Sequence, residues 1–341
     1  MIPIIFSDRL LQSNTERTVL AADVGGTKVN LALYTISAGK MEARQTKQYH
    51  SAAFHSFSEI ANSFFLEYSI EKPGSICAGV AGAVVNGKAH LVNLPWGISA
   101  EQVSDETGVG KVTLINDLEA NAYGLALLKD EDLTTLHKGD PFAGNAAIIA
   151  PGTGLGEAGL FWDGGFYRPF ATEGGHCDFA PRTDLDTELH TYLKQIHGIV
   201  SWEHVVSGPG ILSVYKFLRD VKKMEEPEWL KNEMQIEDPS AAISEAALQN
   251  KAEICVKAMD LFVEHLARIC TIIALKMKAT GGIFLGGGIA PKIVKLLQEE
   301  LFVETFTTCD RQKDLMDIIP IQVIMNDKTA LLGAAFYGAY S

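Results

Sequence analysis

The sequence lacks the features of disulfide-stabilised, exported and membrane-spanning proteins. Its five cysteines are scattered and include no Cys-x-x-Cys pair, which indicates reduced thiols in a cytoplasmic protein. No stretch of about 18 residues is free of charged side chains, so we expect no membrane helix. The apolar N-terminus Met1–Phe6 has no basic segment, which makes it a poor signal peptide.

Positive charge is also scarce, and two common nucleotide motifs are missing. The chain has 29 Lys and Arg against 42 Asp and Glu, a formal charge of -13, which argues against a nucleic-acid partner. No G-x-x-x-x-G-K-[ST] sequence occurs, and the glycines at 152, 154 and 156 do not have G-x-G-x-x-G spacing. A nucleotide would therefore have to be held by backbone amides of another kind of loop.

The chain does contain a glycine turn between two apolar runs, and it contains this arrangement twice. Asp23-Val24-Gly25-Gly26-Thr27-Lys28 lies between the runs 19–22 and 29–34. Pro151-Gly152-Thr153-Gly154-Leu155-Gly156 lies between 146–150 and 158–162. Each pattern predicts a hairpin whose bend can bring backbone N–H groups close to an anion. One such turn is as well explained by an ordinary hairpin, but two, together with Gly286-Gly287-Gly288, favour a polyphosphate site.

Three side chains beside these turns suit phosphate chemistry. Thr27 and Thr153 offer hydroxyl donors to phosphate oxygens. Asp23 can hold water on a phosphate-bound Mg²⁺. The turns therefore direct attention to phosphotransferases.

The length of 341 residues is enough for two sizeable cores. Apolar periodicity predicts mixed elements, namely strands at 46–50, 76–80, 112–115, 282–285 and 321–324, and helices at 56–70, 99–106 (capped by Ser99), 118–128, 251–278, 291–300 and 329–337. Each half of the chain begins with a glycine turn between two apolar runs, and this similarity indicates an α/β fold with two lobes around a cleft. We expect an N-terminal extension over 1–17, a small domain over 18–127 plus 325–341, and a large domain over 128–324.

Asn116-Asp117 stands at the end of a predicted strand, where α/β folds place ligands. Phosphoryl transfer to an alcohol needs a base near the attacking hydroxyl, and Asp117 fits that role. Asn116 can donate to and accept from a neighbouring hydroxyl. Taken alone, the pair is better explained as a helix N-cap.

A second polar cluster is Glu173-Gly174-Gly175-His176-Cys177-Asp178. The two glycines let Glu173 and His176 face one ligand, and a carboxylate with an imidazole suits paired sugar hydroxyls. A metal site of His176, Cys177 and Asp178 is a weaker alternative, because no second Cys or His lies at ligand spacing. Glu203, in the segment Ser201–Gly210, has no special claim from spacing alone.

These motifs, in this order, resemble those of bacterial glucokinases. The resemblance rests on Asp23–Thr27, Asn116-Asp117, Gly152–Gly156, Glu173–His176, Ser207-Gly208-Pro209-Gly210 and Gly286–Ile289. It covers the chain from about residue 18 to the C-terminus. Each piece alone is weak, but the combination is specific to the branch of the family that lacks the zinc motif.

The resemblance implies an actin-like (ribonuclease H-like) ATPase fold and ATP-dependent phosphorylation of D-glucose at the 6-hydroxyl, which feeds glycolysis. It implies that Mg²⁺ arrives with ATP and that the enzyme is a cytoplasmic homodimer. Asp117 would be the base, and the sugar would be bound by Asn116, Asp117, Glu173, His176 and Glu203. The nucleotide would be bound by Ala22, Asp23, Val24, Gly25, Gly26, Thr27, Gly152, Thr153, Gly154, Gly286 and Gly287. Sugar binding would close the lobes and exclude water.

Two residues depart from the family pattern. Lys28 follows the first turn where Asn is usual in close relatives, and Lys is common in the zinc-containing branch. The cysteine cluster of that branch is absent, so we expect no metal ligated by the protein. Cys177 stands where a small apolar residue is more familiar, and we expect it to pack.

Three rival functions stay open at this point. A kinase for mannose or an N-acetylhexosamine would use a similar set of hydroxyl-binding residues. A sugar sensor that regulates transcription should carry a helix-turn-helix segment and a basic face, and neither the 17-residue extension nor the charge fits. A chaperone-type ATPase would leave Glu173 and His176 without a purpose.

Overall fold

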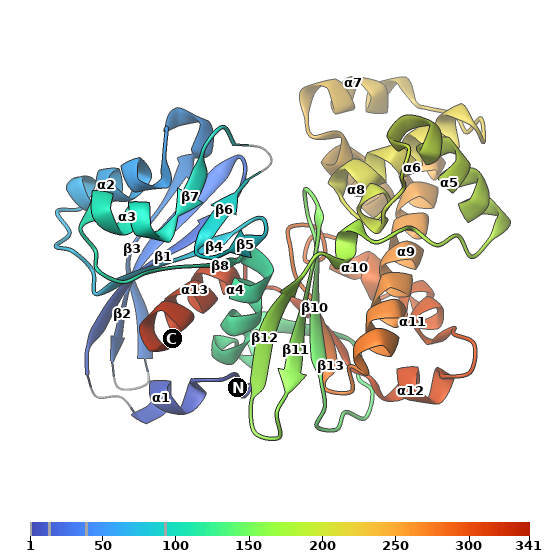
Figure 1. Ribbon diagram of the computed structural model, residues 1–341. Coiled ribbons are helices and arrows are strands. Elements are labelled where there is room, and N and C mark those ends of the chain that lie inside the picture. Colours follow the sequence, from blue (N-terminus) through green and yellow to red (C-terminus); the bar gives the residue numbers. More distant parts are fainter. Residues whose placement is uncertain (1, 13–14, 38–39, 92–93) are drawn as a thin grey trace. The chain divides into compact units, whose positions relative to one another are not determined.

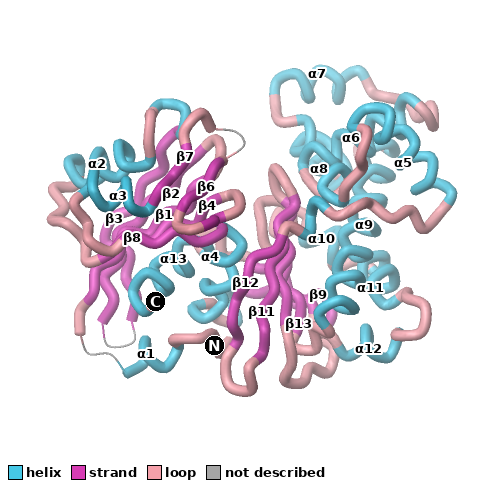
Figure 2. The backbone as a smooth tube through the Cα atoms, in the orientation of Figure 1, coloured by secondary structure: helices cyan, strands magenta, loops and turns pink. Residues whose placement is uncertain are grey.

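The computed structural model describes residues 2–12, 15–37, 40–91 and 94–341, which form two compact units (Figure 1). The first unit comprises 1–132, 160–171 and 326–341, and the second comprises 133–159 and 172–325. Each unit has a main sheet with helices packed against it (Figure 2).

The sheet of the first unit has the strand order β3-β2-β1-β4-β8. Its strands are β1 (Arg17–Val24), β2 (Lys28–Ser37), β3 (Lys40–His50), β4 (Ser75–Val80) and β8 (Val112–Asn116). The first glycine turn joins the antiparallel pair β1 and β2, while β4 and β8 add in parallel. The predicted strands of this half are confirmed. A small sheet of β5 (Val84–Val85), β6 (Lys88–His90) and β7 (Gly97–Ser99) lies beside it.

Helices cover both faces of this sheet because its parallel strands are apolar on both sides. The helices are α2 (Phe57–Glu67), α3 (Ala100–Thr107), α4 (Asp117–Gly124) and α13 (Thr329–Tyr340). Ile76, Ala78 and Val80 of β4 join the core under α2 and α3. Cys77, which points the other way, faces Gly338 of α13.

Glycines let α4 and α13 approach each other unusually closely. A Cβ on Gly333 would lie 1.7 Å from the carbonyl oxygen of Ala120, and one on Gly124 would lie 2.2 Å from that of Thr329. Real Cβ atoms do not approach an oxygen so closely, so both positions require glycine.

Side chains from distant parts of the sequence bind the last carbonyls of α13. The donor–acceptor pairs are Ser75 to Gly338, Arg17 to Ala339, Arg9 to Tyr340 and Lys111 to Ser341. Three of these donors are cations, which the negative end of a helix favours. Arg9 belongs to α1 (Ser7–Gln12), so the segment expected as an extension contributes to this end of the first unit.

The six-stranded main sheet, most of whose strands belong to the second unit, has the order β12-β11-β10-β13-β14-β9. Its strands are β9 (Leu133–His137), β10 (Ala146–Pro151), β11 (Leu155–Trp162), β12 (Tyr167–Thr172), β13 (Gly282–Leu285) and β14 (Ile321–Ile324). The second glycine turn joins β10 and β11, as predicted. Strands β10, β13 and β14 are parallel.

Helices form the rest of the second unit. They are α5 (Asp184–His197), α6 (Gly208–Asp220), α7 (Glu228–Ile236), α8 (Pro239–Leu248), α9 (Glu253–Met277), α10 (Val294–Leu297), α11 (Glu300–Thr307) and α12 (Lys313–Ile318). Helix α9 is the core helix predicted from its apolar side, and it is buried along most of its length. It carries His265 and Arg268, which bond to the buried Asp186 of α5.

Three local predictions are wrong. The helix expected over 291–300 is reduced to α10, because the chain forms turns at 291–293 and again at 298–299 before α11 begins at Glu300. The helix expected over 118–128 ends at Gly124 and continues as a 3₁₀ turn. Ser99 occupies the N-cap of α3, but its side chain makes no capping hydrogen bond.

Candidate active site

The first glycine turn is held by bonds that leave its exposed tip accessible. The Gly25 N–H donates to Lys28 O at 3.0 Å, and Ser51 donates from its N–H to Thr27 O and from its hydroxyl to Gly25 O. Within the described part of the chain, the N–H groups of Gly26 and Thr27 donate to no other residue. These two amides are therefore available to an anion.

Asp23 lies at the start of this turn. Burial raises the pKa of its carboxyl, while a 3.1 Å hydrogen bond from Asn30 Nδ2 lowers it in part. A cation beside this carboxyl would offset the burial and restore its charge. The position thus fits a group that meets phosphate-bound Mg²⁺.

The register of the sheet brings Asn116 and Asp117 to the same edge as the first turn. Val24 pairs with Val80, and Val80 pairs with Asn116. Two strand spacings separate Val24 from Asn116, which is about 10 Å. The first turn and Asp117 therefore belong to one edge of one sheet.

Asn116 is the N-cap of α4, as the interpretation from its sequence context favours. Its Oδ1 accepts from the N–H groups of Leu118 and Glu119 at 2.9 and 3.3 Å, and its Nδ2 donates to Gly82 O at 3.2 Å. These bonds fix the side chain, which is buried. Asp117 follows in the first turn of α4, at the positive end of the helix dipole.

Gly79 of β4 sets how closely α4 approaches the sheet. A Cβ at this position would lie 2.9 Å from the Cβ of Ala120 and 3.6 Å from the Cα of Asp117. A larger residue would push the start of α4, and Asp117 with it, away from the strand. Sequence reasoning missed Gly79, because the glycine of a buried strand gives no sign of the helix that faces it.

In the second unit, Glu203 is bonded to the second glycine turn. Its Oε2 accepts from the Leu155 N–H at 2.9 Å, and a Cβ on Gly154 would lie 2.5 Å from the same oxygen. Position 154 therefore favours glycine, because the Glu203 carboxylate occupies the space that a larger side chain would need. Spacing had given Glu203 no role, and the bond shows that it shapes the turn.

Glu173 and His176 lie next to Glu203 in the same unit. Glu173 is the N-cap of the short helix η4 (Gly174–His176), which ends at His176, and η5 (Trp202–His204) carries Glu203. The Trp202 N–H donates to Cys177 O at 3.0 Å, which joins the two segments. Burial, followed by the charges of His197 and His176, lowers the pKa of His204. The expected sugar residues of this unit thus share one surface region, and Glu173 and His176 are exposed on it.

Cys177 is also exposed, so the expectation that it packs is wrong. The next residue, Asp178, forms an isolated β-bridge with Ser201. Within residues 2–12, 15–37, 40–91 and 94–341, no group of three metal-ligating side chains is found.

The triple-glycine loop lies beside the second turn. The Gly286 N–H donates to Ile149 O at 2.8 Å, and the Ile289 N–H donates to Pro151 O at 3.2 Å. Gly287 has a φ of 76°, and a Cβ there would lie 2.4 Å from Pro151 O. Position 287 of the loop therefore requires glycine. The second turn and the loop form one glycine-lined region.

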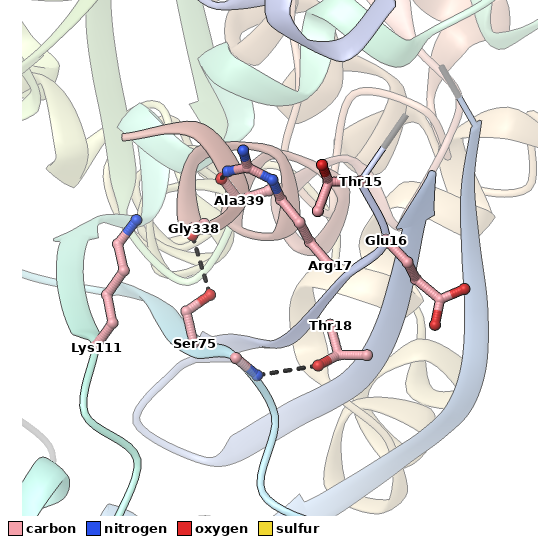
Figure 3. Close-up of a pocket in the computed structure, with 9 residues that line it drawn as sticks. Thr15, Glu16, Arg17, Thr18, Ser75, Lys111, Gly338 and Ala339 are labelled. Atoms are coloured by element: carbon pink, nitrogen blue, oxygen red, sulfur yellow. Dashed lines mark hydrogen bonds between the residues drawn. The ribbon is translucent and has the colours of Figure 1, made fainter. Parts of the chain in front are cut away.

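A pocket elsewhere in the first unit is not part of this site. Figure 3 shows Arg17 and Thr18 of β1, Ser75 of β4 and Lys111 around it. These residues lie at the beginnings of the strands, whereas Asp23 and Asp117 lie at the ends. Arg17 already bonds to the Ala339 carbonyl of α13, and Lys111 to the carbonyl of Ser341, which follows this helix.

The comparisons with known proteins agree on the class and the family. The fold is that of the actin-like ATPase sugar kinases. A crystal structure of a glucokinase from an Antarctic psychrotroph matches with a TM-score of 0.80 and 30% identity, covering 95% of this chain and 99% of that one. A ROK family glucokinase from Streptomyces griseus, solved with glucose and AMPPNP, matches in fold with a TM-score of 0.65 at 18% identity, covering 95% and 100%.

Sequence comparison narrows the class to one family. The model of the family described as Glucokinase matches residues 20–340. The glucokinase of Nostoc punctiforme is 38% identical over 336 residues, which is 94% of this chain and 98% of the relative. The chain belongs to the glucokinase family, as its motifs predict. No helix in the described residues is long and apolar enough to cross a membrane.

Proposed function

We propose that this protein transfers the γ-phosphoryl group of ATP to the 6-hydroxyl of D-glucose. The observation that carries the proposal is the match to the glucokinase family over 20–340. The placement of Asp117 at the same sheet edge as the first glycine turn supports it.

The first unit supplies the base and part of the phosphate site. The Asp117 carboxylate accepts the proton of the 6-hydroxyl as that oxygen attacks phosphorus. Asn116, held by its capping bonds, offers its amide to a neighbouring hydroxyl. The free N–H groups of Gly26 and Thr27 donate to phosphate oxygens, as do the other residues of the segment Ala22–Thr27 where their amides reach. Asp23 would hold water on the Mg²⁺ that ATP carries, and this ion would supply neutralisation of the phosphate charge.

The second unit binds the sugar and the rest of the nucleotide. Glu173, His176 and Glu203 hydrogen-bond to sugar hydroxyls. Gly152, Thr153 and Gly154 donate to phosphate. Gly286 and Gly287 accept the adenosine, since glycines let its flat surface approach the backbone.

A substrate panel tests the reaction. ADP release is measured by a coupled assay with MgATP and glucose, mannose, N-acetylglucosamine or fructose. We expect the highest kcat/KM with glucose, and no turnover when Mg²⁺ is removed with EDTA. Preference for mannose or N-acetylglucosamine would reassign the substrate. Absence of turnover with every sugar, despite sugar binding by calorimetry, would favour a sensor.

The cellular setting is part of the same proposal. The protein works in the cytoplasm, where it supplies glucose 6-phosphate to glycolysis, and it assembles as a homodimer. Light scattering of the purified protein tests the dimer, which should have twice the chain mass of 37.0 kDa. A monomer at micromolar concentration would contradict it.

A further inference from the structure

Glu157, in the middle of β11, is a buried carboxyl group that the proposed reaction does not use. The residue is 6% exposed, and its Oε1 has no hydrogen-bond partner among the described residues. Buried polar atoms are nearly always bonded. A buried carboxyl oxygen without a partner, so close to a candidate sugar site, therefore calls for an explanation.

The carboxyl points at the loop that carries Glu173 and His176. A Cβ on Gly174 would lie 1.9 Å from Glu157 Oε2 and 2.6 Å from its carboxyl carbon. The carboxyl thus fills the space where a side chain of residue 174 would lie. Strand β11 is also bonded to the end of β12, which leads into this loop, because Thr172 Oγ1 donates to Glu157 O at 2.9 Å.

The groups around Glu157 do little to stabilise an ionised carboxylate in this buried position. Lys276 and Cys270, both on α9, are the titratable groups of that helix that act on it. The neighbouring strand β10 is wholly apolar. Arg168, the charged residue of β12, pairs with Asp163 instead, and Glu173 and His176 are exposed on the loop.

This surrounding favours the neutral acid. Burial raises the pKa of Glu157 to about 7, and Lys276 lowers it only in part. A neutral carboxyl can pack against a glycine at little cost. A carboxylate without a donor must draw in water or displace its neighbours.

We propose that Glu157 is a positioning residue, whose protonated carboxyl supports Gly174 from beneath and thereby orients Glu173 and His176 toward the sugar. This inference rests on the proposed function of that loop. Loss of the proton places a charge against Gly174 and shifts the loop. Sugar affinity therefore falls as the pH rises through neutrality, while ATP affinity is unaffected.

The test compares glucose KM and kcat between pH 6 and pH 9 in the wild type, Glu157→Gln and the exposed control Glu225→Gln. In the wild type and the control, KM should rise on the order of tenfold above pH 7, with a smaller change in kcat. Glu157→Gln mimics the neutral acid and should have a flat KM profile. Parallel profiles in the wild type and Glu157→Gln would overturn the inference.

A second pair of variants tests the contact itself. Gly174→Ala should raise glucose KM about tenfold or more, because its methyl group collides with the carboxyl. Combining it with Glu157→Ala, which removes the carboxyl, should recover much of that loss. An equal loss in the single and double variants would refute the contact.

The two failures can be told apart. If the wild type does not phosphorylate any sugar, the proposed function fails. If it phosphorylates glucose but Glu157→Gln leaves the pH profile unchanged and the double variant gives no rescue, only the role of Glu157 fails.

Discussion

Replacing Asp186 by Ala should destabilise the second unit strongly, because this carboxylate joins two helices in its core. Its Oδ2 accepts from the N–H groups of Arg182 and Thr183, both at 2.9 Å, and from Arg268. Its Oδ1 accepts from His265 Nε2 at 3.0 Å. His265 and Arg268 are 0% and 5% exposed, so the change leaves a buried cation with Glu264 at 3.4 Å as its remaining ion pair.

The size of the effect follows from these bonds. Breaking a buried ion pair by removing one partner costs about 3–5 kcal/mol, and losing the capping contacts of α5 adds about 1 kcal/mol. We expect a loss of about 4–6 kcal/mol in the free energy of unfolding of this unit. Asp186→Asn keeps one acceptor and the shape, and should lose about 2–3 kcal/mol.

The assay is urea unfolding followed by circular dichroism, with Asp184→Asn as the matched control. Asp184 lies in the first turn of the same helix and is exposed. Its substitution should change the free energy by less than about 0.5 kcal/mol. A loss below about 1 kcal/mol for Asp186→Ala would refute the argument that this network stabilises the core.

The pH dependence gives an independent check. Burial alone would raise the pKa of Asp186, but hydrogen bonds from His265, the Arg182 N–H and Arg268 hold it far below its usual 3.8. Because the folded pKa lies below the unfolded one, this contribution is complete above about pH 5 and is lost as the pH falls below 4. Asp186→Asn should lack this part of the acid destabilisation.

Three further changes test other parts of the structure. Gly333→Ala should lower the free energy of unfolding of the first unit by about 2–3 kcal/mol, because the added methyl group forces α13 away from α4. The change is measured as a lower Tm, and an unchanged Tm would contradict the close contact between the two helices. Glu157→Gln should stabilise the second unit at pH 8 by about 3 kcal/mol, because the pKa rises from 4.5 to about 7 on folding. In the wild type, the stability that the neutral Glu157 carboxyl contributes is complete below pH 4.5 and is lost as the pH rises to about 7. The gain in stability from Glu157→Gln should therefore shrink as the pH falls. A gain that does not change with pH would contradict this prediction. Arg17→Met should lower the stability of the first unit by about 1 kcal/mol through the end of α13, whereas Arg44→Met, as an exposed control, should have almost no effect.

Local pattern was enough to predict the parts of the candidate site that depend on neighbouring residues. Asp23–Thr27 and Gly152–Gly156 are turns between apolar runs, and Asn116 caps the helix that directly follows it. In each case the residues that determine the conformation are adjacent in the chain. The family motifs then supplied roles for Asp117, Glu173 and His176, which stay predictions until tested.

The remaining features depend on partners far away in the sequence. Gly333 faces Ala120, and no residue close to either of them in the sequence indicates this contact. Glu157 falls in an apolar strand where a charged residue suggests a solvated side, and only the positions of η4 and α9 show that it is buried. The position of Glu203 is fixed by the hydrogen bond that it accepts from the Leu155 N–H. The spacing of residues in the sequence does not predict this bond.

The most direct test of the central claim is the turnover of Asp117→Asn beside the exposed control Asp105→Asn, with saturating glucose and MgATP. If Asp117 is the base of a glucose kinase, its substitution should lower kcat on the order of 10²-fold or more, while the Kd for ATP and the Tm stay near the wild-type values. The control should turn over as the wild type does. Turnover of Asp117→Asn within about twofold of the wild type would contradict the account.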